Sequence, residues 1–249
     1  MTLLSVNLNK VALLRNARDG DSPSVVHAAE MCLEAGAGGI TVHPRPDQRH
    51  SRPSDVVELA VVVSSEPAAE FNVEGNPFPE FLDLVRAIRP TQCTLVPDDP
   101  DAVTSDHGWD LQQHGERLRP IVSELQDLGI RISLFMDPDA DQMSRAREIG
   151  VDRVELYTES YARAHATGEG RGELESYSAA AVTAQELGLG VNAGHDLSHR
   201  NLADFCRALP DVLEVSIGHA LISHALEVGL RQSVEDHLDA LSGAEAEYV

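Results

Sequence analysis

The chain has 249 residues, 42% hydrophobic and 24% charged, and 41 acidic against 19 basic residues give it a formal net charge of −22. Such a surface repels phosphate backbones, so this balance argues against nucleic-acid binding. No apolar run approaches the roughly 18 residues of a membrane helix, and the three cysteines lack CxxC spacing, so we expect a cytoplasmic protein without membrane contact, disulfide framework or metal.

Strand-like and helix-like segments alternate eight times along the chain. Strands are expected near residues 3–8, 39–43, 70–74, 92–96, 131–136, 153–157, 190–193 and 213–217. Helices are expected near 23–35, 54–63, 79–88, 115–128, 141–149, 174–187, 201–208 and 220–240, with Ser22 and Pro23 opening the first. No linker interrupts this alternation, which predicts an α/β protein: one (β/α)8 TIM barrel over residues 1–249.

Apolar and polar residues alternate within the expected strands. Val154 and Leu156, for example, flank Glu155. Because helices cover the outside of a parallel barrel, the apolar parity should face outward and the polar parity should line the interior. The polar set comprises Asn7, Asn9, Thr41, His43, Asn72, Glu74, Ser133, Glu155, Tyr157, Asn192 and Ser216. Buried polar groups are costly unless they hydrogen-bond or serve a site, so this pattern indicates a site inside the barrel.

Three of the expected strands lead directly into a histidine, namely His43, His195 and His219. The carboxyl ends of all strands in a parallel barrel lie on one face, so these three side chains are expected to converge. Histidine is the side chain that titrates near neutral pH. The arrangement therefore predicts a site for proton transfer.

A series of short motifs in a fixed order carries a more specific resemblance. They include Gly39-Ile40-Thr41-Val42-His43-Pro44-Arg45, Phe71-Asn72-Val73-Glu74, Val191-Asn192-Ala193-Gly194-His195 and Ile217-Gly218-His219-Ala220. Each motif is short, but their order and spacing extend over nearly the whole chain. Together they resemble the pyridoxine 5′-phosphate synthase family of vitamin B6 biosynthesis.

This resemblance implies a reaction and an assembly. Members of the family are barrel transferases that condense 3-amino-2-oxopropyl phosphate with 1-deoxy-D-xylulose 5-phosphate. The products are pyridoxine 5′-phosphate, inorganic phosphate and water. The family needs no redox cofactor and forms homo-oligomers, commonly octamers. Imine formation, elimination and ring closure all move protons, which requires several acid–base groups around one cavity.

The resemblance also implies a role for each matching residue. His43 and Glu74 are the expected general bases, His195 is the general acid, and Glu155 stabilises cationic intermediates or relays protons. The expected contacts to the xylulose phosphate are Arg45, His50 and Thr104. Those to the aminoacetone phosphate are Asn7, Arg18, Asp196, Gly218 and His219. A helix that starts just after the last barrel strand is also a recurring phosphate site, because its backbone N–H groups point at the anion.

Two positions depart from the family pattern. Asn9 and Lys10 stand where many members carry Asp-His, and Asp196 stands where many carry glycine. We expect Asn9 and Lys10, the only lysine, to contact the xylulose substrate, with a Schiff-base lysine or a solvated one as alternatives. Asp196 can still offer its backbone N–H to a phosphate if its side chain turns away.

Other interpretations remain open at this point. The barrel could belong to another phosphosugar enzyme, an aldolase or isomerase, or to a non-catalytic protein that binds phosphorylated ligands. Glu155 could form a structural salt bridge with an arginine. The remaining histidines are expected mostly on the surface or on helices: His27, His107, His114, His165, His199, His224 and His237.

Overall fold

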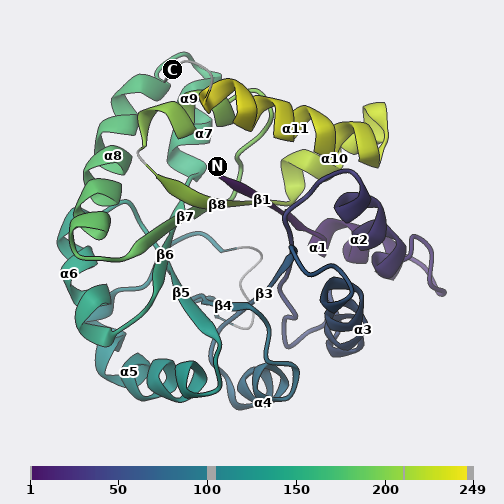
Figure 1. Ribbon diagram of the computed structural model, residues 1–249, viewed down its shortest axis with the longest axis horizontal. Helices are drawn as coiled ribbons and strands as arrows, with labels where there is room; N and C mark the ends of the chain where they lie inside the picture. Colours follow the sequence, from purple (N-terminus) through teal and green to yellow (C-terminus); the bar gives the residue numbers. More distant parts are fainter. Residues whose placement is uncertain (1, 100–104, 210, 246–249) are drawn as a thin grey trace.

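A closed barrel of parallel strands forms the centre of the computed structural model, which describes residues 2–99, 105–209 and 211–245 (Figure 1). The strands follow one another around the barrel in sequence order, and β1 pairs with β8 to close it. They are β1 (Leu3–Asn7), β2 (Gly39–Val42), β3 (Glu70–Gly75), β4 (Gln92–Leu95), β5 (Arg131–Met136), β6 (Arg153–Tyr157), β7 (Gly190–Gly194) and β8 (Val212–Ile217). The predicted (β/α)8 barrel is thus confirmed.

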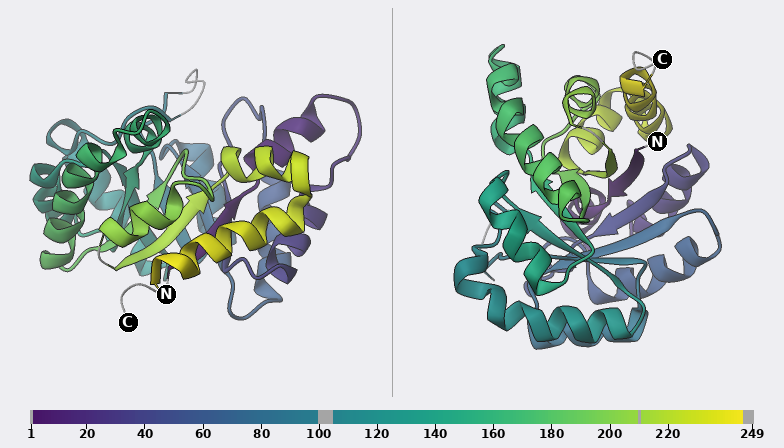
Figure 2. Two further views of the ribbon diagram at one scale, coloured as in Figure 1. Left: turned by 90° about the horizontal axis from the view of Figure 1, so that it is seen from above. Right: turned by 60° about the vertical axis from the view of Figure 1, so that its left-hand side comes forward.

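Helices surround the barrel on its outside (Figures 1 and 2). One after each strand packs in this outer layer: α2 (Val25–Glu34), α3 (Pro53–Ser64), α4 (Pro79–Ile88), α5 (Leu111–Asp127), α6 (Ala140–Ile149), α8 (Gly170–Glu186), α9 (Leu202–Ala208) and α11 (Leu230–Glu245). Three further helices start directly after strands β1, β6 and β8: α1 (Asn9–Asn16), α7 (Glu159–Ala166) and α10 (His219–Val228). Within the described residues, no helix is long and apolar enough to cross a membrane.

The helices differ from the sequence-based prediction in several places. Helices α1 and α7 were not predicted, and the segment expected as one helix over 220–240 is two helices, α10 and α11. They separate at Gly229, whose φ of +90° favours glycine and ends α10. The first predicted helix starts at Val25 rather than at Pro23, because the Ser24 side chain caps it by accepting from the His27 N–H.

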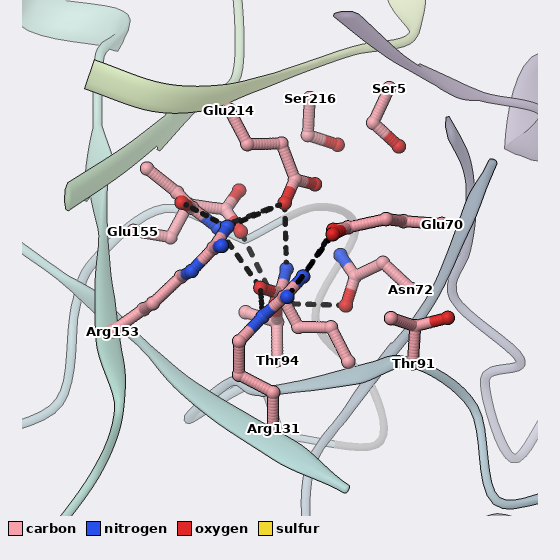
Figure 3. Close-up of polar contacts among 12 residues, drawn as sticks. Ser5, Glu70, Asn72, Thr91, Thr94, Arg131, Arg153, Glu155, Glu214 and Ser216 are labelled. Carbon is pink, nitrogen blue, oxygen red and sulfur yellow. Dashed lines mark hydrogen bonds and ion pairs between the residues drawn. The ribbon is translucent and has the colours of Figure 1, made fainter. Parts of the chain in front are cut away.

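The predicted alternation of the strands is confirmed by the burial of their side chains. The apolar parity, such as Ile40, Val73 and Leu156, is fully buried beneath the helices. The polar parity points into the barrel, where its members bond to one another across strands (Figure 3). Thr94 Oγ1, for instance, donates to Asn72 Oδ1 at 3.1 Å. Most of the interior polar groups are thus hydrogen-bonded, which removes most of the cost of burying them.

A layer of charged side chains closes the N-terminal end of the barrel. Arg131 pairs with Glu70, and Arg153 Nη1 lies 3.5 Å from Glu214 Oε2 (Figure 3). The amides of Gln92 and Asn192 also donate to Glu214 Oε2, each at 3.1 Å. These pairings leave the opposite, C-terminal end of the barrel open for a site.

Three histidines form a cluster beside α11 that the sequence did not predict. The rings of His199 and His224 stack with centroids 4.1 Å apart, and the His199 and His237 centroids are 5.4 Å apart. His237 lies on α11, as expected for a helix residue, but it is fully buried, and its Nδ1 lies 2.7 Å from the Ser233 carbonyl oxygen. Burial lowers the pKa of His237 to about 4, so the folded protein keeps this ring neutral.

This buried ring should make the protein less stable in mild acid. The unfolded chain binds a proton at His237 below about pH 6.5, whereas the folded chain resists protonation until about pH 4. The free energy of unfolding should therefore fall as pH drops through this window, by about 3 kcal/mol from this residue. Urea titrations at pH 7 and at pH 4.5 measure the free energy of unfolding at each pH. The loss of this free energy between pH 7 and pH 4.5 should be smaller in His237→Gln than in the parent protein, by most of this amount.

The exposed His27 provides the matched control, because His27→Gln also removes an imidazole but from a solvated site. The free energy of unfolding of His27→Gln should vary with pH as it does in the parent protein. If His237→Gln kept the full acid sensitivity, protonation of His237 would not contribute to unfolding.

Candidate active site

A cavity of about 570 Å³ lies at the C-terminal ends of the strands. The predicted site residues that line it are Asn7, Asn9, Lys10, His43, Arg45, His50, Glu74, Glu155, His195, Asp196, Gly218 and His219. The structure thus brings together residues from segments spread over most of the chain. Arg18 is exposed just beyond α1 and is not among the lining residues, and Thr104 lies outside the described residues.

Two carboxyl groups project into this cavity from the barrel. Glu74, on β3, accepts from Asn7 Nδ2 at 3.4 Å and from Ser216 Oγ at 3.5 Å. Glu155, on β6, accepts from Thr94 Oγ1 at 3.3 Å. Gly194 makes room for this carboxyl group, because a Cβ at that position would overlap Glu155 Oε1.

Burial favours the protonated, neutral form of both carboxyl groups. Burial raises the pKa of Glu155 to about 8, and the nearby charge of Glu214 adds to the shift. The pKa of Glu74 lies well above its usual value because of burial and then because of Glu155. An arginine was considered above as a salt-bridge partner of Glu155. The interior arginines Arg131 and Arg153 instead pair with Glu70 and Glu214. Two buried, closely coupled carboxyl groups are suited to exchanging protons with a ligand.

His43 follows β2 and is held in place through its backbone. Its N–H donates to Asn9 Oδ1 at 2.9 Å, and the same oxygen accepts from Ser51 Oγ at 2.8 Å. Burial lowers the pKa of His43 well below its usual value, with Arg45 and His50 adding to the effect. The imidazole is therefore neutral at physiological pH and can accept a proton. Asn9, which was expected to contact the substrate, lines the cavity, and its side-chain oxygen also holds the His43 backbone.

His195 lies across the cavity, just after β7. Its ring packs edge-on against Tyr157 with centroids 5.1 Å apart. The Asp196 carboxylate lies 3.0 Å from His195 Nδ1. Together with His43 and the two carboxyl groups, this imidazole completes a set of titratable side chains around one cavity.

Groups that can hold anions stand at two sides of the cavity. Arg45 and His50, from the segment after β2, stand on one side, and Arg45 is buried in an ion pair with Asp98. On the other side Gly218 caps α10 and His219 begins it, so free N–H groups of this helix lie at the cavity. A Cβ at Gly218 would lie 3.1 Å from Asn7 Cβ, so this turn approaches β1 closely.

Several lining residues were not predicted as site residues. Ser216 belongs to the polar parity of β8, so the alternation already placed it inside the barrel, and Arg49 lies in a motif segment after β2. Leu13 and Phe135 are apolar and carry no signal of a site in the sequence. Among the residues that the structure describes, no group of three or more His, Cys, Asp or Glu side chains is arranged to hold a metal ion.

The sequence was compared with known families and proteins. The sequence model of the family described as "pyridoxal phosphate biosynthesis protein PdxJ" matches residues 4–243. The chain belongs to the PdxJ family. Relatives of this PdxJ-family chain include the pyridoxine 5′-phosphate synthases of Xanthomonas campestris pv. campestris (strain B100), 51% identical over 97% of both chains, and of Xanthomonas axonopodis pv. citri (strain 306), 53% identical over 96% of both.

Solved structures of other enzymes share the fold of this PdxJ-family chain. The thiamine phosphate pyrophosphorylase from Pyrococcus furiosus superposes with a TM-score of 0.59 at 14% identity, covering 98% of this chain and 96% of its own. At that level of identity the similarity supports the barrel fold alone.

Proposed function

We propose that this chain is a pyridoxine 5′-phosphate synthase that condenses 3-amino-2-oxopropyl phosphate with 1-deoxy-D-xylulose 5-phosphate. The observation that carries the proposal is the convergence of His43, Glu74, Glu155 and His195 in one cavity with anion-binding groups at two of its sides. Membership of the PdxJ family and the names of its relatives support this assignment. The products are pyridoxine 5′-phosphate, inorganic phosphate and water.

The protonation states support a different role for each of the four groups. His43 is neutral and serves as a general base. The substrate amine arrives as an ammonium ion, whose positive charge lowers the pKa of Glu74 and Glu155 and relieves their mutual repulsion. Glu74 then acts as a base, while Glu155 stabilises cationic imine-like intermediates. His195 donates protons to the leaving oxygen atoms.

The two phosphates bind at different parts of the cavity wall, one after β2 and one after β8. The xylulose phosphate binds near Arg45 and His50, where a guanidinium fork suits a phosphate. The aminoacetone phosphate binds at the start of α10, where the backbone N–H groups and the helix dipole favour an anion. Asn7 lies beside this turn and supports the same ligand.

We also propose that the chain forms a homo-oligomer in the cytoplasm, as its resemblance to the family implies. The cysteines Cys32, Cys93 and Cys206 are free thiols, which fits a reducing compartment. Leu13 and Leu14 on α1 and Leu226 and Val228 on α10 expose apolar side chains, and α1 contacts α10. Such a patch is suited to contact between subunits.

Light scattering should give the mass of an oligomer, and a monomer mass would contradict this part of the proposal.

Removal of one phosphate at a time tests the substrate assignment. Ring formation should be followed with the two proposed substrates, and then with aminoacetone or 1-deoxy-D-xylulose replacing its phosphate ester. We expect product only when both substrates are phosphorylated. Equal turnover with a dephosphorylated substrate would show that the corresponding phosphate site is wrongly assigned.

Lys10 should contribute to binding of the xylulose phosphate. It lies in the first turn of α1 on the cavity wall, where its ammonium group can reach an anionic ligand. Lys10→Ala should raise KM for 1-deoxy-D-xylulose 5-phosphate about 10-fold and leave kcat within a few-fold, because one charged hydrogen bond contributes about 1.5 kcal/mol. Lys10→Arg should recover part of this loss.

Steady-state kinetics with each substrate varied in turn provides the measurement. A loss of kcat in Lys10→Ala, together with a substrate-dependent adduct on Lys10 after borohydride treatment, would instead indicate a Schiff-base lysine. Lys10 is the only lysine of the chain, so such an adduct has a single side-chain target.

A further inference from the structure

The side chain of Asp196 contacts the residue that precedes it, His195. Its Oδ2 lies 3.0 Å from His195 Nδ1. Both residues are partly buried, with side chains 28% and 33% exposed for His195 and Asp196. The contact therefore joins a carboxylate and an imidazole at the edge of the cavity, where solvent only partly screens their attraction.

An unusual backbone conformation produces this contact. His195 and Asp196 have φ angles of +78° and +59°, two successive left-handed residues that are not glycine. Hydrogen bonds hold both peptide groups, since Thr158 Oγ1 donates to the His195 carbonyl oxygen and Asn201 Nδ2 donates to that of Asp196 at 3.4 Å. Aspartate tolerates this conformation better than most residues. Glycine would adopt it more easily but would provide no acceptor for the ring.

The surroundings keep the Asp196 side chain charged. Its hydrogen bond with His195 lowers its pKa, and the nearby His219 and Lys10 act in the same direction. A carboxylate can only accept, so the proton of this bond sits on His195 Nδ1. The nitrogen on the far side of the ring, Nε2, is then the one that exchanges protons with a ligand.

We propose that Asp196 is a positioning residue, which fixes the orientation and the tautomer of His195. The proposal rests on the proposed role of His195 as general acid. A ring whose Nδ1 is held by Asp196 presents Nε2 to a ligand.

The effect of Asp196→Asn on kcat and on KM tests this role. The amide has the same shape, but it can either accept from Nδ1 or donate to it, so it no longer fixes one tautomer. We expect kcat to fall about 10-fold, because less of His195 presents a proton on Nε2. KM for both substrates should change by less than about 3-fold. Asp196→Gly should lose at least as much kcat.

Asp211 provides a matched control, because it is an exposed aspartate with a φ of +46° just before β8, at the far end of the barrel. Asp211→Asn should keep the parent kcat and KM. If Asp196→Asn instead raised KM with an unchanged kcat, Asp196 would contact substrate directly and the positioning role would be wrong.

A parallel assay of His195→Gln separates this proposal from the proposed function. Loss of turnover in His195→Gln with an unchanged kcat in Asp196→Asn would overturn the role of Asp196 alone. Near-normal turnover in His195→Gln would overturn the general-acid role, and the positioning role with it. In the double variant, Asp196→Asn should cause no further loss of kcat, because its effect passes through His195.

Discussion

Glu74→Gln should abolish most of the ring-forming activity while the cavity keeps its shape. Glutamine has the size of glutamate, and its amide oxygen can accept from Asn7 Nδ2 while its amide nitrogen donates to Ser216 Oγ, the two groups that bond to the carboxyl group in the parent chain. It cannot take up or release a proton at neutral pH. Loss of one positioned acid–base group lowers kcat by on the order of 10²–10⁴. Binding of both phosphorylated substrates should survive, since their phosphates bind elsewhere in the cavity.

The measurement combines turnover with calorimetric titration of each substrate. Glu58→Gln is the matched control, because Glu58 is an exposed carboxylate on α3. It should keep the parent kcat. Near-normal turnover of Glu74→Gln would remove Glu74 from the catalytic set, whereas loss of binding would indicate a role in holding substrate.

Glu155→Gln should stabilise the protein at alkaline pH and lower its activity. The folded-state pKa of Glu155 is raised to about 8 by burial and by Glu214. Between the unfolded value near 4.5 and about pH 8, the folded chain holds a proton that the unfolded chain releases. The free energy of unfolding should therefore fall as pH rises through this window, by on the order of 4 kcal/mol. Glutamine carries no such penalty, because it stays neutral.

Urea denaturation at pH 5 and pH 9 provides the test. The two proteins should have similar stability at pH 5, and Glu155→Gln should be more stable at pH 9. Glu148→Gln, which alters an exposed carboxylate on α6, should leave the pH dependence unchanged. Equal stability of Glu155→Gln and the parent at pH 9 would contradict the raised pKa. Such a gain in stability with a loss of turnover is expected at a site selected for chemistry.

The sequence predicted the barrel and most of the site because both depend on short-range patterns. Alternation around Glu155 fixed which side chains face the interior, and strand ends such as His43 and His195 indicated the open face of the barrel. The family resemblance supplied the order of the motifs and the roles of individual residues. These features can be predicted without knowledge of tertiary contacts, since each is local to one strand.

Features that depend on contacts between distant segments were not predictable. The α1 helix has only eight residues and exposes Leu13 and Leu14, so its periodicity does not indicate a buried face. Arg131 and Glu214 stand at strand ends where charges usually meet solvent, yet here they close the barrel with partners from other strands. The contact of Asp196 with His195 likewise depends on two left-handed residues that the sequence does not reveal.

The central claim is that this polar barrel joins two phosphorylated substrates into a pyridoxine ring. The most direct test is to mix the purified protein with 3-amino-2-oxopropyl phosphate and 1-deoxy-D-xylulose 5-phosphate, and to quantify pyridoxine 5′-phosphate and free phosphate over time. We predict that both products appear together at a ratio of one to one, and that neither appears when one substrate is omitted. Phosphate release without ring formation, or no reaction by protein that binds both substrates, would contradict the claim.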